Sequence, residues 1–373
     1  MYDFFPTLLF LIGVRSNGKS TITKWEVLLL AVPIVLIPLT QAWIVLLKGY
    51  SMLYYCSNIK CTKKCLCQLL IRAFVVADWI ILKVKEKEIA SLLQRFKTLK
   101  RLRGSIFRRC NLIINSATVI ILLFSTVVYI FIVEHFLTNI EDSKRYFAAA
   151  TFNANISLDD FTISILTALY FLVTRLTRTV IPSLLSIIYI TWCNALCEAV
   201  KRCKDMIRIP TANKTLDYLP FIQEYTYTYN LIAEIENIFS SHVFCLIGAN
   251  FFVFFLSFTQ LVGFTSIFDM PQKTENFTIL LVQGVLLFVI IYKAAKVGEE
   301  DRLVRKKVKD LVFFLLSSKE TCHNGNFLSE FLNSKPNITL TAGGAFTFTK
   351  SLLFTTVGVI ITYNLLILQL QIT

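Results

Sequence analysis

Charge is scarce in this sequence: only 17% of its 373 residues are charged, and glycine and proline occur just 12 and 8 times. A soluble domain is typically about a quarter charged. Because 55% of the residues are hydrophobic, the composition excludes a disordered chain, and the few glycines and prolines exclude a collagen-like one. The same balance argues against an ordinary soluble enzyme.

Sequence motifs of catalysis are missing as well. The chain contains neither HExxH nor GxSxG, the patterns of zinc proteases and serine hydrolases. Residues 13–20 fit the nucleotide-binding pattern GxxxxGKS formally, but they precede a membrane span instead of opening a helix in a soluble α/β domain. We therefore expect no enzyme and no bound cofactor.

The apolar residues occur in long uncharged blocks, and a helix needs about 20 such residues to cross a bilayer. Five blocks lack charge entirely, and two more, 65–82 and 161–197, contain only two charged residues each. The 37 residues of 161–197 exceed what a bilayer needs, so they form either one span with an inward extension or two short spans. We predict an all-α membrane protein with seven transmembrane helices.

Basic residues give the orientation, because Lys and Arg beside membrane helices mark the cytoplasmic side. With a cytoplasmic N-terminus, 27 of the 38 basic residues fall inside and 7 outside. The net charge of +14 is thereby explained without a nucleic-acid partner. The expected order is an inner N-terminus (1–25), span one (26–47), span two (65–82), an inner helical loop (83–111), span three (112–133), an outer loop (134–160), span four (161–181), an inner helical segment (182–242), span five (243–268), span six (276–295), an inner anchor segment (296–345) and span seven (346–373).

The inner segments carry amphipathic patterns of their own. Apolar residues recur at helical spacing over 84–106, 218–239 and 303–315. Such helices lie on the lipid surface or pack together, and three stripes on one side favour a cytoplasmic helical anchor bundle with room for oligomer contacts. The basic stretch 83–109 is either a solvated face or a contact with anionic membrane lipid.

Cysteine, histidine and glycosylation signals add little chemistry. Cys56, Cys61, Cys65 and Cys67 lie in or beside the first outer loop, where a local disulfide is an option. They lack a second ligand pair and a nearby histidine, so no metal site is expected. Of four Asn-x-Ser/Thr sequons, only Asn155 falls in an accessible outer loop and is a candidate for glycosylation.

The final span differs from the others in its polar content, with threonine, asparagine and glutamine distributed along it. Polar side chains in membrane helices usually face a helix bundle or water instead of lipid. Tyr363, Leu366, Leu370 and Thr373 fall on one stripe. The helix is therefore either glued to neighbours by these groups or lines a pore.

Residues of this span also match a known family pattern. Thr362-Tyr363, five residues and Gln369-Leu370 resemble the insect gustatory receptor signature of Thr-Tyr, five mostly apolar residues and Gln-Phe. Leu370 replaces the phenylalanine that is usual at this position of the signature. The strings Gly344-Ala-Phe346 and 237–240 are similar to further family features.

The resemblance implies a ligand-gated, non-selective cation channel that assembles as a homo-tetramer or a hetero-tetramer in the plasma membrane of chemosensory dendrites. By resemblance the last helix lines the pore and Gln369 and Leu370 form its gate, while Tyr363 and Leu366 are pore candidates because they share a stripe with Leu370. A small-molecule tastant would bind in the outward half of the other spans. An aromatic-lined pocket suits a bitter or deterrent plant compound better than a sugar. The polar or aromatic candidates there are Tyr129, Thr167, Tyr170, Gln260 and Gln283.

Two other classes of membrane protein compete with this interpretation. A G-protein-coupled receptor also has seven spans, but its orientation would leave the basic excess outside. A small-solute transporter would show an internal repeat and carboxylates at mid-membrane, whereas Asp78 is the only acidic residue in the interior of a predicted span.

Overall fold

The structure is a computed structural model of the whole chain. It describes residues 42–43, 45–46, 49–50, 59–92, 95, 116, 126–131, 133–150, 158–175, 179–207, 218–262, 270–317 and 321–372. Predicted features that lie outside these residues are the inner N-terminus, most of span one, the first part of span three and Asn155.

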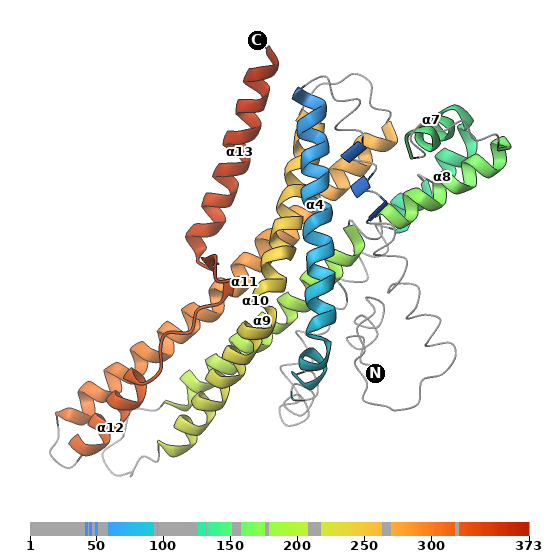
Figure 1. Cartoon of the computed structure of the whole chain (residues 1–373). Coiled ribbons are helices and arrows are strands. Elements are labelled where there is room, and N and C mark those ends of the chain that lie inside the picture. The colour runs from blue at the N-terminus through green and yellow to red at the C-terminus, as the bar shows by residue number, and fades with distance from the viewer. Residues whose placement is uncertain are drawn as a thin grey trace, which may run out of the picture. The chain divides into compact units, whose positions relative to one another are not determined.

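The described chain is almost entirely helical (Figure 1). Three stretches within it, Ile181–Met206, Leu219–Thr259 and Asn276–Leu316, are long and apolar enough to cross a membrane. The prediction of an all-α membrane protein is therefore confirmed. The elements are α4 (Ile59–Val84), α7 (Ile140–Ala150), α8 (Asp160–Arg175), α9 (Ile181–Met206), α10 (Leu219–Val262), α11 (Met270–Leu316), α12 (Cys322–Asn333), β1 (Thr341–Ala342), β2 (Phe346–Thr347) and α13 (Lys350–Ile372).

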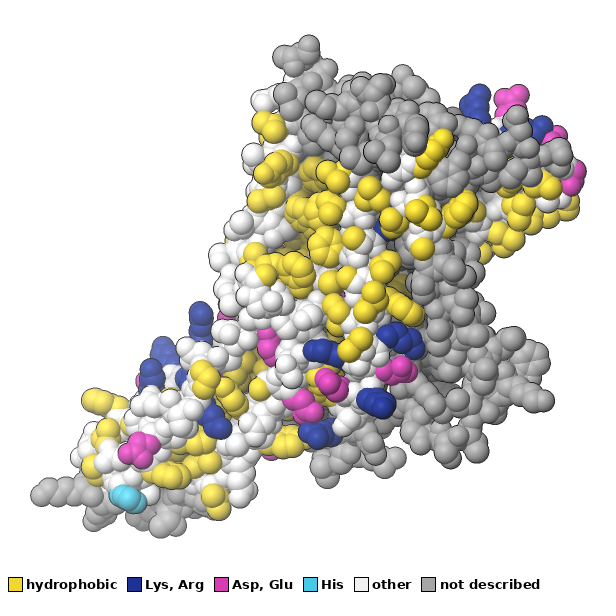
Figure 2. Space-filling view, viewed as in Figure 1, with side chains coloured by type: hydrophobic (Ala, Val, Ile, Leu, Met, Phe, Trp, Pro, Cys, Tyr) yellow, Lys and Arg dark blue, Asp and Glu magenta, His cyan; other side chains and the backbone are white. Residues whose placement is uncertain are grey.

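The chain divides into two compact units whose boundaries fall inside helices. Unit 1 comprises residues 1–188, 244–288 and 356–373. Its core includes a cluster in which α4 packs against the end of α10 and the start of α11, formed by Ile71, Val75, Ala249, Val253, Leu256 and Ile279. Figure 2 shows hydrophobic side chains over the visible face of α4 and charged ones gathered at its C-terminal end.

Unit 2 comprises residues 189–243 and 289–355. It is a helical bundle, because each amphipathic stripe is buried: Tyr225 and Ile235 on α10, Val304 and Val308 on α11, and Leu328 on α12 are all at most 1% exposed. The Trp192 and Phe239 rings lie 5.1 Å apart and join α9 to α10. The predicted packing of the inner stripes against one another is thus confirmed for 218–239 and 303–315, both of which lie in this unit.

Two helices are longer than the predicted segments. The stripe 218–239 and span five form the single 44-residue helix α10, and span six and the stripe 303–315 form the 47-residue helix α11. Each helix has a proline in its first turn, Pro220 or Pro271, and no other proline. Proline is tolerated at that position and breaks helices elsewhere, so nothing in either sequence stops the helix at the membrane border.

The segment predicted as span four is described as two helices, α8 and α9, with residues 176–178 outside the described residues. Thr179 and Val180, just before α9, have π-helical backbone. Pro182 is the second residue of α9. π-Turns and prolines are usual causes of bends in helices. Residues 161–197 can therefore form either one bent span with an inward extension or two short spans.

Candidate functional site

The sequence break before the last helix is a tight β-hairpin in unit 2 (Figure 1). Strands β1 and β2 pair antiparallel, with Thr341 opposite Thr347 and Ala342 opposite Phe346. Gly343 and Gly344 form the turn with φ values of 60° and 69°, a conformation that glycine adopts without the Cβ penalty of other residues. This explains the glycine pair.

The hairpin is tied to α10 by the string 237–240 and its neighbour Glu236. The Gly343 amide donates to the Ser240 carbonyl oxygen at 2.8 Å, and the hydroxyls of Ser240 and Thr341 are 3.0 Å apart. Glu236 accepts hydrogen bonds from the Thr341 amide at 2.9 Å and from the Thr341 hydroxyl. The resemblance pointed to 237–240 without assigning it a role, and the contacts show that it fixes the segment from which α13 begins.

A second anchor holds the chain just before the hairpin. The carboxylate of Asp301, which is 0% exposed, accepts hydrogen bonds from the Tyr225 hydroxyl at 2.7 Å, the Arg305 Nε at 2.8 Å and the Ile338 amide at 3.0 Å. Arg305 donates further to the carbonyl oxygens of Leu332, Lys335 and Pro336. One buried acid therefore joins α10, α11 and the irregular segment that leads into β1.

The proposed pore residues lie on the exposed surface of α13. Thr362, Tyr363, Leu366 and Gln369 are exposed in the single chain, whereas the side chain of Leu370 lies outside the described residues. Tyr363 is 56% exposed and Leu366 49%. The exposed surface of α13 thus carries both polar and apolar side chains.

Two of the five predicted ligand residues meet in unit 1 at a buried polar cluster that we call the Thr179 cluster: Tyr129, Thr179, Ser183 and Gln283. The Tyr129 and Thr179 hydroxyls are 2.5 Å apart. The Gln283 Nε2 donates to the Thr179 carbonyl oxygen at 3.2 Å and to the Ser183 hydroxyl at 2.9 Å. Thr179, Ser183 and Gln283 are all buried.

The sequence prediction missed the α9 side of this cluster. Thr179, Ser183 and Ser186 follow one another at spacings of four and three residues, which places them on one helix face. That spacing was a readable signal. Ser186 accepts a hydrogen bond of 3.1 Å from Asn250 Nδ2 on α10. The same face of α9 therefore contacts a second buried amide, and Asn250 also lies within a predicted span.

The other three predicted ligand residues are elsewhere. Thr167 is buried and its hydroxyl donates to the Ser143 carbonyl oxygen of α7 at 3.2 Å. Tyr170 is half-buried on α8, and the side chain of Gln260 lies outside the described residues. Of the sequence candidates, the contacts that the structure describes thus join only Tyr129 and Gln283, through Thr179.

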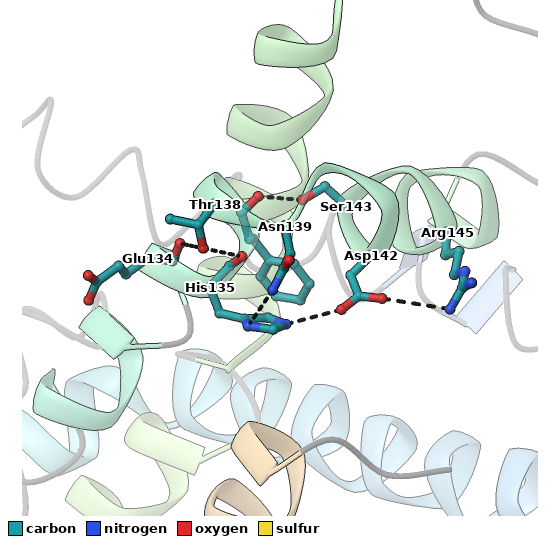
Figure 3. Close-up of polar contacts among 8 residues, drawn as sticks. Glu134, His135, Thr138, Asn139, Asp142, Ser143 and Arg145 are labelled. Atoms are coloured by element: carbon teal, nitrogen blue, oxygen red, sulfur yellow. Dashed lines mark hydrogen bonds and ion pairs between the residues drawn. The ribbon is translucent and has the colours of Figure 1, made fainter.

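A polar turn precedes α7 in the segment predicted as an outer loop (Figure 3). The His135 ring lies between Asn139, whose Nδ2 is 3.2 Å from Nδ1, and Asp142, whose Oδ2 is 3.2 Å from Nε2. Asp142 also faces Arg145 at 3.8 Å. These contacts close the turn between two helical segments and account for His135 structurally.

Asp159 directly precedes α8, at the end of the same predicted outer loop. Its carboxylate accepts hydrogen bonds from the Thr162 hydroxyl at 2.6 Å and from the Thr162 amide at 3.0 Å. These bonds lower the pKa of Asp159 below its ordinary value, the hydroxyl contributing most. Such N-terminal capping satisfies a backbone donor that the helix itself leaves unpaired.

Metal-binding geometry is absent from the described part of the chain, where no three His, Cys, Asp or Glu side chains gather in a suitable group. Cys67, the one member of the outer cysteine group with a described side chain, is a free thiol. Cys56, and the side chains of Cys61 and Cys65, lie outside the described residues.

Comparison with known proteins identifies the fold. No protein-family model and no curated protein sequence matches the chain. The solved structure of the insect olfactory receptor OR5 from Machilis hrabei is similar, with a TM-score of 0.57 and 12% identity over 98% of this chain and 96% of that one. The same receptor in complex with eugenol gives a TM-score of 0.56 and 10% identity, with the same coverage of both chains. The chain therefore has the fold of an insect olfactory receptor along almost its whole length.

Proposed function

We propose that this chain is a gustatory receptor: a ligand-gated, non-selective cation channel that a tastant opens, and not an enzyme. The fold shared with an insect chemosensory receptor supports the receptor class. The string Thr362-Tyr363 with Gln369 seven residues after Thr362 supports the gustatory branch. The plasma membrane of a chemosensory dendrite is the corresponding location.

The exposed surface of α13 is the observation that carries the proposal. Thr362, Tyr363 and Gln369 are exposed in a helix whose first part, Lys350–Tyr363, is apolar. Polar side chains toward lipid are costly, so this surface needs water or other protein around it. A pore lined by α13 from several copies supplies both, which supports a homo-tetramer or a hetero-tetramer with related receptors.

The gate in this proposal comprises Gln369 and Leu370, and Tyr363 and Leu366 line the pore on the same stripe as Leu370. Apolar constrictions close pores by dewetting, and leucine can serve at position 370 as the family's phenylalanine does. The N-terminus would be cytoplasmic and the C-terminus external, so that the stripe lies toward the outer end of the pore.

The tastant in this proposal binds near the Thr179 cluster, where Tyr129 and Gln283 already meet. Thr167, Tyr170 and Gln260 stay candidates from the sequence alone, because the described contacts do not join them to this cluster. Tyr129 supplies an aromatic face, which favours a bitter or deterrent plant compound over a sugar. Eugenol is the first compound to test, because the OR5 structure contains it.

Whole-cell current recording in cells that express the full chain tests the proposal. We expect cation current when eugenol or another compound of a plant-metabolite panel is applied. Second-messenger signalling without current would support a G-protein-coupled receptor instead, and substrate uptake without current a transporter. Mock-transfected cells and surface labelling of a tagged chain serve as controls.

Substitutions at the gate separate pore from pocket. Gln369→Ala and Leu370→Ala should alter gating or ion permeability more than the half-maximal ligand concentration. Gln371→Ala is the matched control, because two residues along a helix point about 200° apart. A change in ligand potency alone would contradict the gate assignment.

A further inference from the structure

The π-turn at Thr179 and Val180 is a weak point in a membrane helix. It directly precedes α9, and Pro182, which has no amide hydrogen, is the second residue of that helix. π-Turns inside helices occur often at functional positions, and a proline removes one hydrogen bond from the helix ladder. The backbone around Thr179 is therefore less constrained by its own helix than the regular turns of α9 are.

Side chains from other elements replace part of that constraint. The Thr179 carbonyl oxygen accepts hydrogen bonds from Gln283 Nε2 of α11 at 3.2 Å and from the Ser183 hydroxyl at 2.7 Å. The Thr179 hydroxyl bonds to Tyr129. All contacts lie within unit 1. The turn is thus held by α11 and by the segment of Tyr129 from two directions.

Only the Nε2 group of the Gln283 amide has hydrogen-bond partners among the described residues. Its Nε2 has two acceptors, but its Oε1 has no donor among the described residues, although the side chain is 1% exposed. A buried carbonyl oxygen without a donor is unfavourable. The Gln283 amide is therefore satisfied through its Nε2 alone, and both of its described contacts lie at the π-turn and the first turn of α9.

We propose that the Thr179 π-turn is a hinge of the gating motion and that Gln283 is the positioning residue that holds it. The inference rests on the proposed channel function and adds an element to it. Release of the amide frees the turn at Thr179 and Val180 to change its backbone angles at the start of α9. Gln283 then affects opening through Thr179, whether or not it touches a tastant.

The control residue is Asn250, which offers the same chemistry without the hinge. It is 0% exposed, its Nδ2 donates to Ser186, and its Oδ1 also lacks a donor among the described residues. Ser186 lies in regular helix, seven residues after Thr179. Gln283→Leu and Asn250→Leu therefore remove equivalent buried amides at, and away from, the π-turn.

The experiment uses the full chain and two readouts that need no ligand. The first is basal current at matched surface expression, and the second is hydrogen exchange of the backbone amides of residues 180, 181, 183 and 184 in detergent-solubilised protein. We expect Gln283→Leu to change basal open probability, and to accelerate that exchange, by roughly three- to tenfold, the effect of one or two buried hydrogen bonds. Asn250→Leu should leave both within about twofold of the native values.

The outcomes separate the hinge from the channel. Unchanged exchange in Gln283→Leu, or equal effects in both variants, would overturn the hinge whatever the current does. Faster exchange only in Gln283→Leu with a shifted basal current supports it. If no variant and no native chain conducts under any compound, the proposed function fails, and the exchange result still decides whether Gln283 holds the turn.

Discussion

The carboxylate of Asp301 shows how much one buried residue holds in place. It accepts three hydrogen bonds, from Tyr225, Arg305 and Ile338, and has no exposed surface. Removal of one partner from a buried charged pair leaves the other charge without compensation, which is more costly than the loss of a neutral hydrogen bond.

Substitution of Asp301 should therefore destabilise unit 2 strongly. We expect Asp301→Ala to cost about 3–5 kcal/mol, and Tyr225→Phe, which removes one donor to a charged group, about 1.5–3 kcal/mol. Thermal melting of the purified chain, monitored by fluorescence-detected size-exclusion chromatography, shows which variant loses more stability. A smaller loss for Asp301→Ala than for Tyr225→Phe would contradict this account of the anchor.

The sequence alone does not identify Asp301 as a buried anchor. Asp301 lies in a run of charged residues, 299–302, and such a run is usually solvated. Its burial follows from the way Tyr225 and the segment around Ile338 fold onto α11, and these are far apart in sequence. Tyr129 and Gln283 were predicted as candidates because each is a polar or aromatic residue in an apolar span, which is a local signal. Thr179 was not, since threonine inside a helix usually bonds to its own backbone.

At the scale of elements, the hairpin before α13 depends on glycine. Gly344 has a φ of +69°, and a Cβ added to it would contact nothing within 4 Å, so a substitution there tests backbone conformation alone. We expect Gly344→Val to destabilise the chain by about 1–2 kcal/mol. Gly344→Asn should cost less, because asparagine tolerates positive φ. Melting temperatures that are equal for both variants would contradict the assigned turn.

Contact between α10 and α11 depends on another glycine. A Cβ on Gly284 would lie 2.5 Å from the Phe254 ring, so Gly284→Ala overpacks the interface and should cost about 1–3 kcal/mol. Gly284→Ala combined with Phe254→Leu should recover much of the loss. The melting temperatures of the two single variants and the double variant measure this coupling, and strictly additive effects would rule it out.

The sequence predicted the helical segments but not the lengths of the continuous helices that they form. The apolar periodicity identified 218–239 and span five separately, because the exposed and buried positions change when a helix leaves the membrane. The structure joins them in α10, since no proline or glycine pair interrupts the sequence there. The turn before span seven, by contrast, can be read from the sequence, because Gly343-Gly344 is a strong local turn signal.

At the scale of the whole molecule, the proposed orientation follows from the 27 to 7 distribution of basic residues. We expect an epitope tag at the N-terminus to be detected only after permeabilisation, and a tag at the C-terminus to be detected on intact cells. Staining of a cytoplasmic marker controls for leakage. The reverse pattern would exclude the proposed topology and, with it, the outward position of the gate.

The anchored hairpin also fixes the rotational phase of α13. Thr341 and Gly343 are tied to α10, and α13 begins at Lys350, so the number of residues between them determines which side of the helix faces any given direction. One inserted or deleted residue in 344–349 would turn the whole helix by about 100°. Tyr363, Leu366 and Gln369 would then face another direction, so the length of this short segment matters as well as the identity of Gly344.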